Sequence, residues 1–377
     1  MVRYHEHGGW SYDWVESRRG LWFVAGVALM DARPLLDVGE GELADWLEGQ
    51  GAASFRARQV LDWVMRRRAA GFESMTDVPA ALRVGLAKEW RVFVGTMVSD
   101  EVAPDGTEKL LIAWPDGRRV ECVLLHEAGR HTVCLSTQVG CGMGCVFCAS
   151  GLKGVERNLT SGEILEQVLR LRNRLPEGEN LTNIVVMGMG ESLANLDNLL
   201  VALDRICSRE GLGLSPRRVT ISTVGLPEKI RKLAEMDRPY HLAVSLHAPT
   251  EALRNELVPI NDKVGLNAVM EAADFYFDRT GRQVTYEYVL LHGVNDRFEE
   301  ARALGELLAH RKAHVNLIPY NPVVGLPYER PDVESIRVFA QEVKRHGVSV
   351  TVRKTKGRPI DAACGQLRRR QESVVTT

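Results

Sequence analysis

The sequence predicts an α/β protein in which a small helical domain and a β-hairpin precede a large region of repeated βα units. From His131 onward, short β-rich runs alternate with helical segments, which is the pattern of βαβ units around a parallel sheet. Residues 35–91 have a helical pattern and residues 92–126 a strand-like one. With 377 residues and 45% apolar content, the chain has material for one large domain and a small accessory domain.

The first 34 residues show no clear period and stay an unassigned N-terminal extension. Within them, the apolar run Leu21–Met30 is about half the length that a membrane helix needs. Arg18 and Arg19 precede it, but no small-residue cleavage site follows cleanly. We therefore expect a buried segment rather than a signal peptide.

The helical domain and the hairpin follow from local patterns. Leu43, Trp46 and Leu47 recur at helical spacing, as do residues 60–65, and Gly71 and Pro79 interrupt the pattern. Between residues 92 and 126, the alternating stretches 110–114 and 119–123 are separated by a Pro-Asp-Gly turn. A small hairpin is expected to join the two larger parts.

Six or seven βα units follow over about 225 residues, too few for a closed eight-fold barrel. A partial barrel or an open sheet is expected, and in either the chemistry belongs at the carboxyl ends of the strands. The expected strands are 132–136, 183–187, 218–222, 241–246, 284–291, 314–318 and 349–352, and the expected helices are 162–174, opened by a Thr160-x-x-Glu163 capping box, 297–311 and 333–346.

Three cysteines lie in a C-x3-C-x2-C run just after the first strand of the βα region. Cys141, Cys145 and Cys148 can each ligate one iron of a cubane cluster, which leaves the fourth iron open to chelate S-adenosylmethionine. A structural zinc site would need a fourth ligand, usually in paired C-x2-C spacing, and no such ligand sits nearby. A redox disulfide would leave one cysteine unexplained. The run therefore predicts a radical S-adenosylmethionine (SAM) enzyme.

Polar and glycine residues at later strand ends are candidates for binding SAM. Singly, each is more often a satisfied loop residue, but all are expected on one edge of one sheet. His247, beside Pro249, also fits a simple turn cap and is not expected to act as a base. The candidates are Gly190, Glu191, Ser222, Ser245, Leu246, His247 and Asn321.

Several long segments resemble the RlmN/Cfr family of radical SAM RNA adenine methyltransferases, over about residues 35–367. Ser192 stands where proline usually follows Gly-Met-Gly-Glu in that family. The segments that carry the resemblance are Cys134–Cys141, Gly188–Glu191, Val219–Gly225, Ser245–Pro249, Glu287–Leu291, Val315–Pro322 and Ile360–Leu367.

The resemblance implies a partial (β/α)6 barrel at residues 127–367, an RNA-binding accessory domain at 35–91, a β-rich linker at 92–126 and a basic tail at 368–377. It also implies residue roles that the spacing alone leaves open. Cys364 would carry the methyl group, Cys134 would be the resolving thiol and Glu121 the proton acceptor. A solvated strand-end carboxylate is the alternative for Glu121. Cys122 and Cys207 match no family role and are expected to be packing residues.

Carbon 2 of adenine is too electron-poor to attack a sulfonium methyl group, so a radical route is required. The implied reaction uses two SAM molecules: one methylates the Cys364 thiolate, and the cluster reduces the other to a radical source. Cys134 then releases the methylated adenine as a disulfide forms, and an external thiol reduces that disulfide. The implied substrates are 23S rRNA, before ribosome assembly is complete, and tRNA. An external electron donor, a monomeric state and no membrane association are also expected.

Three other functions remain open. The stretch 353–357 and the approach to Cys364 resemble the branch that methylates carbon 2, and the related branch methylates carbon 8. A non-catalytic Fe-S RNA-binding paralogue would not need Cys364. A radical enzyme acting on a protein or a small metabolite would leave the pair Cys134 and Cys364 without a purpose.

The charge balance gives no general attraction to RNA, because the net charge is only -1. RNA binding would use local basic stretches at 66–68, 353–356 and 368–370. Seven cysteines, three of them within eight residues, do not suggest a secreted disulfide framework. We expect a cytoplasmic protein.

Overall fold

The computed structural model describes residues 32–354 and 356–367, except the side chain of Arg358. It also describes the backbone of four short strands before them: β1 (Val2–His5), β2 (Gly9–Tyr12), β3 (Trp14–Glu16) and β4 (Trp22–Val24). The expected burial of residues 21–30 and the expected basic tail 368–377 lie outside the described residues.

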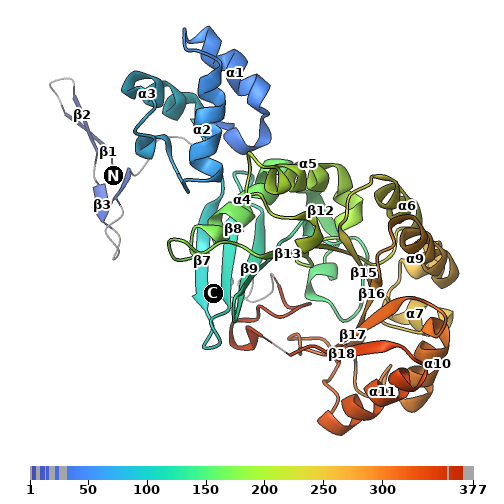
Figure 1. Cartoon of the computed structure of the whole chain (residues 1–377). Coiled ribbons are helices and arrows are strands. Elements are labelled where there is room, and N and C mark those ends of the chain that lie inside the picture. The colour runs from blue at the N-terminus through green and yellow to red at the C-terminus, as the bar shows by residue number, and fades with distance from the viewer. Residues whose placement is uncertain are drawn as a thin grey trace.

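A ten-stranded mixed sheet forms the body of the protein (Figure 1). Seven of its strands, from β10 to β18, pair in parallel, and the remaining three pair antiparallel at one side. In pairing order, the strands are β18 (Ser349–Val352), β17 (Ala313–Pro319), β16 (Val284–Leu290), β15 (His241–Ser245), β14 (Val219–Thr223), β13 (Asn183–Val186), β10 (Arg130–Cys134), β9 (Arg119–Glu127), β8 (Glu108–Ala113) and β7 (Thr96–Val102).

Helices connect the successive parallel strands, as the sequence predicts for βα units, and the sheet stays open between β18 and β7. Each expected strand and helix is present, with ends shifted by a few residues. Thr160 and Glu163 form the expected capping box at the start of α4. The connecting helices are α4 (Ser161–Arg172), α5 (Leu196–Cys207), α6 (Pro227–Glu235), α7 (Glu251–Leu257), α8 (Asn261–Val264), α9 (Leu266–Thr280), α10 (Phe298–Leu308) and α11 (Val333–Arg345).

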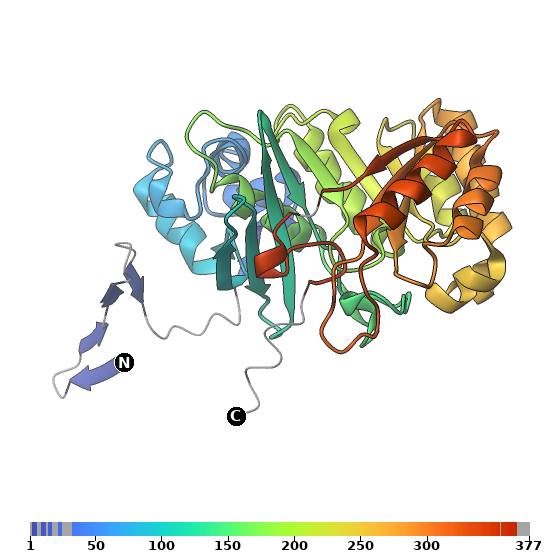
Figure 2. The ribbon, with the colours of Figure 1, turned by 90° about the horizontal axis from the view of Figure 1, so that it is seen from below.

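The β-hairpin is not a separate connection between two bodies. β9 pairs antiparallel with β10, so β7, β8 and β9 extend the catalytic sheet by three strands. Seen from below, these teal strands stand between the accessory helices and the βα region (Figure 2). Local patterning predicted the hairpin, but it contained no signal for the pairing of β9 with β10.

The accessory domain contains α1 (Glu40–Gly49), α2 (Phe55–Met65) and α3 (Ala80–Glu89), which stand above α4 and α5 in Figure 1. Polar groups hold it to the catalytic domain. Asp37 Oδ1 accepts a hydrogen bond from the backbone N–H of Gly162, in the first turn of α4, at 2.7 Å. The guanidinium of Arg172 donates to the carbonyls of Val64 and Met65. Arg205 donates in the same way to the carbonyls of Leu36 and Val38.

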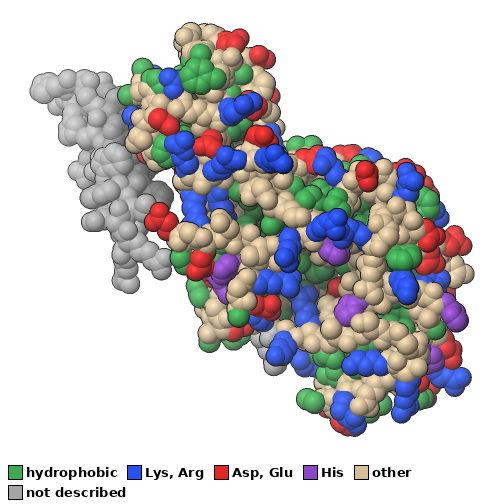
Figure 3. Space-filling view, in the orientation of Figure 1, with side chains coloured by type: hydrophobic (Ala, Val, Ile, Leu, Met, Phe, Trp, Pro, Cys, Tyr) green, Lys and Arg blue, Asp and Glu red, His purple; other side chains and the backbone are tan. Residues whose placement is uncertain are grey.

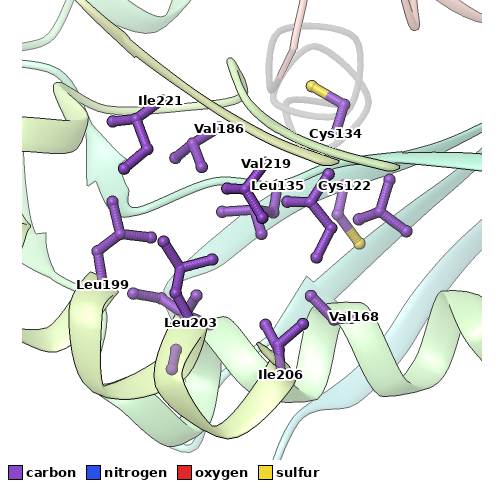
Figure 4. Packing of buried hydrophobic residues seen from close by; sticks show 14 of the residues in the cluster. Cys122, Cys134, Leu135, Val168, Val186, Leu199, Leu203, Ile206, Val219 and Ile221 are labelled. Carbon is purple, nitrogen blue, oxygen red and sulfur yellow. The ribbon is translucent and has the colours of Figure 1, made fainter. Parts of the chain in front are cut away.

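The main apolar core lies between the sheet and the helices that cover it. Successive side chains of a strand point to opposite faces of the sheet. Cys134 on β10 pairs with Val123 of β9, so the neighbouring Cys122 points to the other face. Their sulfur atoms point in opposite directions, with that of Cys122 toward Val168 (Figure 4). Cys122 is fully buried and Cys207 packs against the core, as expected.

No helix among the described residues is long and apolar enough to cross a membrane.

Asp37→Ala should lower the free energy of unfolding by about 1–2 kcal/mol, because two donors at the start of α4 lose their acceptor. Urea unfolding followed by circular dichroism measures this change. Asp45→Ala, at an exposed site of α1, is the matched control and should change stability by less than about 0.5 kcal/mol. Equal effects of the two substitutions would contradict a docking role for Asp37.

Candidate active site

A cavity opens at the carboxyl ends of the parallel strands, where the sequence predicts the site. We call it the cluster cavity, because all three cysteines of the C-x3-C-x2-C run line it. Of the other predicted site residues, it includes Gly190, Glu191, Ser222, Ser245, His247, Asn321 and Cys364. Leu246, Cys134 and Glu121 do not line it.

The cysteine loop follows β11 (Gln138–Gly140), and its shape depends on two glycines with left-handed backbone. Gly140 has φ 77° and Gly144 has φ 71°, conformations that glycine adopts without a Cβ clash. The loop is anchored where Cys141 N–H donates to Gly154 O at 3.0 Å and Val146 N–H to Leu257 O at 3.2 Å. Both glycines therefore turn the chain around the thiols.

The three thiols fit an iron-sulfur cluster. Burial raises the pKa of Cys141 to about 12 and also raises the pKa of Cys145 and Cys148, so metal binding must displace their protons. No three His, Cys, Asp or Glu side chains of the described residues converge as ligands of a single ion. Cluster ligation does not require that convergence, since each thiolate binds a different iron.

The Gly-Met-Gly-Glu segment packs tightly against the start of the cysteine loop. Gly190 has φ 104°, and a Cβ there would lie 2.6 Å from Gln138 Cβ. The buried carboxylate of Glu191 accepts the N–H groups of Leu193 at 3.0 Å and Val224 at 2.8 Å. Its predicted contact with SAM would use the remaining lone pairs. Ser192 is accommodated, because its hydroxyl donates to Val186 O at 3.2 Å.

The ends of β14 and β15 bring two predicted hydroxyl groups together. Ser222 Oγ and Ser245 Oγ lie 3.4 Å apart on the wall of the cluster cavity. Leu246 is fully buried, so only its backbone would be available to a cofactor. That backbone accepts a hydrogen bond from the buried guanidinium of Arg254, which also donates to the carbonyls of Val224 and Ser245. Arg254 thereby holds both strand ends in place.

His247 is a neutral hydrogen-bonding group. Burial, and then the charge of Arg254, lowers the pKa of His247 to about 3. Its Nδ1 lies 3.1 Å from the backbone N–H of Val289 and accepts that hydrogen bond. The proton of the neutral ring therefore sits on Nε2, where it can be donated to a ligand. A neutral ring whose Nδ1 already accepts a hydrogen bond is better suited to donating from Nε2 than to accepting a proton.

Asn321 provides a further sign that the cavity is shaped for a polar ligand. Its Oδ1 is buried and accepts no hydrogen bond from the described residues. Such an atom costs free energy unless a ligand or water satisfies it. Together with the thiols and the Ser222–Ser245 pair, this atom fits the adenosyl and amino-acid groups of SAM.

Cys364 lies in the wall between the cluster cavity and a second cavity. We call the second one the Cys134 cavity, because Cys134 lines it while the cluster cysteines do not. Gly365 O accepts the N–H of Ala149 at 2.8 Å, which ties the C-terminal segment to the cysteine loop. The cluster cysteines and Cys134, which are distant from Cys364 in sequence, thus line cavities on two sides of the Cys364 sulfur atom.

Glu121 lies outside both cavities and is not solvated. It is buried on β9 and forms an ion pair with Lys109 Nζ at 3.0 Å, so the solvated strand-end alternative is wrong. It shares a sheet face with Val123, which pairs with Cys134 and lines the Cys134 cavity. The predicted proton acceptor is therefore near this cavity but not in its wall.

The basic stretches do not all face a partner. Arg68 donates to the carbonyls of Leu175, Pro176 and Glu179 and so joins the two domains. Arg353 donates to Cys364 Sγ. Other Lys and Arg side chains gather on the lower part of the accessory domain and around the hollow of the catalytic domain (Figure 3). That face is suited to a polyanion.

Three site residues were not predicted as such, although Glu287 and Arg353 lie in stretches that resemble the family. Arg254 and Glu287 look like ordinary charged residues of a helix and a strand, and Arg353 looked like part of a basic surface patch. Glu287 is buried on the wall of the cluster cavity, and burial raises its pKa. Each acts through contacts that only the fold creates.

Comparisons with known proteins agree with this geometry. The radical SAM superfamily model matches residues 135–304, and that of the ribosomal RNA large subunit methyltransferase N-terminal domain matches residues 34–92. The probable dual-specificity RNA methyltransferase RlmN of Rhodopirellula baltica is 54% identical over 343 residues, 91% of this chain and 92% of that protein. The protein of the same description from Symbiobacterium thermophilum is 44% identical over 92% of this chain and 94% of that protein.

Among solved structures, a radical SAM methyltransferase from Sphaerobacter thermophilus matches with a TM-score of 0.86 and 43% identity, over 89% of this chain and 99% of that chain. The predicted fold class is thereby confirmed.

His247→Asn should make stability less sensitive to acid. The folded-state pKa lies below the unfolded value of about 6.5, so stability is complete above that value and is lost as the pH falls toward 3. Between pH 7.5 and 5.5 the wild-type protein should lose about 1.4 kcal/mol more than the variant. Asparagine tolerates the positive φ of 62° at this position.

Urea unfolding at both pH values gives the difference. His310→Asn, at an exposed site, is the control and should leave the acid sensitivity as in the wild type. Identical pH dependence of the wild type and His247→Asn would contradict a neutral, buried His247.

Proposed function

Because this chain belongs to the RlmN family of radical SAM RNA methyltransferases, we propose that it methylates carbon 2 of adenine in both ribosomal and transfer RNA. The observation that carries the proposal is the position of Cys364 between two cavities, with the cluster cysteines lining one and Cys134 the other. A methyl-carrying thiol must meet SAM, the adenine and a resolving thiol.

A [4Fe-4S] cluster and SAM are the cofactors of this family. In the proposed site, Cys141, Cys145 and Cys148 hold the cluster, and the strand ends from Gly190 to Asn321 hold SAM. When bound, the two supply the methyl group and the radical that activates it. His247 Nε2–H and Asn321 Oδ1 provide one donor and one acceptor of fixed position, which would orient the nucleoside part.

Cys364 is the proposed nucleophile. As a thiolate it would take the methyl group that bound SAM supplies, forming a C–S bond as the sulfonium C–S bond breaks and S-adenosylhomocysteine leaves. After the methylene carbon is joined to adenine, Cys134 attacks Cys364 Sγ. A disulfide forms as the S–C bond to the adenine adduct breaks, and the released carbon takes up the proton lost by the Cys134 thiol to become the methyl group. An external thiol returns both sulfur atoms to the reduced state.

Glu121 is kept as the proposed proton acceptor. Its carboxylate is buried and lies 3.0 Å from Lys109 Nζ, which fixes its position on β9. Its shared face with Val123 puts the proposed proton path along the Cys134 cavity.

The proposal also covers RNA binding, the cellular compartment and the oligomeric state. We propose that residues 35–91 bind the RNA next to the catalytic domain at 127–367, with 92–126 as the β-rich segment between them, and that 23S rRNA is modified before assembly is complete. The target base must be unstacked to reach a buried thiol. Free thiols and an iron-sulfur cluster suit a reducing cytoplasm, and one chain contains the whole proposed site, which suits a monomer.

Incubation of the reconstituted protein with labelled SAM, dithionite and unmodified 23S rRNA or tRNA should yield 2-methyladenosine after digestion to nucleosides. Chromatography against 2-methyl- and 8-methyladenosine standards identifies the product. Formation of 8-methyladenosine would favour the alternative branch. Absence of any methyladenosine while 5′-deoxyadenosine still forms would refute RNA as the substrate.

Cys134→Ala should trap a covalent protein–RNA adduct, because the S–C bond between Cys364 and the adenine then has no nucleophile to break it. Gel electrophoresis of labelled RNA detects the slower band, and turnover should fall by at least about a hundredfold. Cys122→Ala removes a thiol on the opposite face of the same sheet and should turn over without an adduct. Clean turnover by Cys134→Ala would rule out its resolving role.

A further inference from the structure

We propose that Arg353 is a catalytic residue, whose contact with Cys364 Sγ makes Cys364, and not Cys134, the nucleophile of methyl transfer. This inference deepens the proposed function and rests on it. The two thiols border the same cavity, so proximity alone does not explain why one carries the methyl group and the other resolves the product.

The guanidinium of Arg353 is fixed against one of the two sulfur atoms. Arg353 Nη1 donates to Cys364 Sγ at 3.2 Å. Its own backbone N–H donates to Leu317 O at 2.8 Å, which extends the pairing of β17 and β18 by one residue. The side chain lines both cavities, as Cys364 does. Strand pairing therefore fixes the backbone from which the Arg353 side chain reaches Cys364 Sγ.

A cation in hydrogen-bond contact stabilises a thiolate relative to the thiol. The contact also favours the charged guanidinium, because the negative charge of a Cys364 thiolate is the largest cause of the raised pKa of Arg353. Glu287, buried nearby on β16, adds a second negative charge that favours the guanidinium. Asn316 Nδ2 donates to Glu287 Oε2 at 2.8 Å and fixes that carboxylate.

The surroundings of Cys134 favour its protonated form instead. It is buried, and no described hydrogen bond joins it to Arg353. Burial, followed by the charge of Cys364, raises the pKa of Cys134 to about 12, and Arg353 opposes this only through space. Burial therefore favours the protonated form of Cys134, whereas the cation of Arg353 is in hydrogen-bond contact with Cys364 Sγ.

This arrangement also orders the two steps. Methylation converts Cys364 from a thiolate to a neutral thioether, so the charge that disfavours ionisation of Cys134 disappears. The guanidinium then faces one anion fewer and can stabilise the Cys134 thiolate. Cys134 thus becomes a better nucleophile once Cys364 has been methylated, at the stage when the S–C bond that it must break is present.

Other charged or titratable groups line the same two cavities. From the strands come Glu127 of β9, Glu287 of β16 and His247 after β15, and from the loops come Cys148, Glu191, Lys354 and Lys356. None of these groups has a described hydrogen bond to Cys364 Sγ, which distinguishes Arg353 from them.

The test measures the alkylation of single cysteines, without RNA and without SAM. The cluster-loaded protein is treated with iodoacetamide, a neutral reagent, between pH 6 and 10, and mass spectrometry follows the peptides of Cys364 and Cys134. Arg353→Met should slow alkylation of Cys364 at pH 7 by at least about tenfold and shift its pH midpoint upward. The rate should recover at high pH, and Arg353→Lys should lie between the two.

An unchanged midpoint in Arg353→Met would overturn the proposal. A rate lowered by the same factor at every pH would also overturn it, because that result means altered access and not a lost charge. Lys354→Met removes an exposed charge from the next residue and should change the rate by less than about threefold. An effect as large as that of Arg353→Met would refute the direct contact.

A measurement on the wild type keeps the proposal testable if a variant does not fold. The pH midpoint of Cys364 must lie below that of Cys134, and the reverse order overturns the proposal. RNA methylation is assayed in parallel on the same samples. Since alkylation needs neither RNA nor SAM, the pH midpoints of the two cysteines can be interpreted even if the protein does not methylate RNA.

Discussion

Parallel pairing of the strands from β10 to β18 is the constraint on which the site depends. It brings the carboxyl ends of seven strands to one edge, so that residues from β13, β14, β15, β16 and β17 line one cavity. The sheet does not close, and β7 to β9 continue it on the β10 side. The opening leaves room for a C-terminal segment to return across the strand ends, and that segment carries Cys364.

Hydrogen bonds and buried apolar side chains together hold the returning C-terminal segment, and Ile360, Ala362 and Leu367 pack into the main core. Gly365 O binds the cysteine loop, Lys356 Nζ donates to His126 O at 2.7 Å and Gly357 N–H donates to Asp105 Oδ2 at 2.9 Å. Each partner belongs to a different part of the sheet edge. A segment tied in this way is held near both cavities without filling either of them.

Buried and half-buried arginines have a similar role throughout the molecule. Arg172 and Arg205 bind carbonyls of the accessory domain, and Arg254 binds the carbonyls at the ends of two strands. A guanidinium suits these positions because it presents several donors in a rigid plane and remains charged when buried. At Arg353 the guanidinium donates to a sulfur atom instead of a carbonyl, and this contact is part of the proposed chemistry.

The sequence by itself determined the βα order, the cysteine loop and the strand ends that line the cluster cavity, because each depends on local period or on spacing within a few residues. It also identified Cys134 and Cys364 through the family resemblance. Only the tertiary structure decided that Leu246 and Glu121 lie outside the cavity, that Arg68 joins two domains and that Arg353 contacts Cys364. These outcomes depend on which distant segments pack together, and a charged residue looks the same in sequence whether it faces solvent or a thiol.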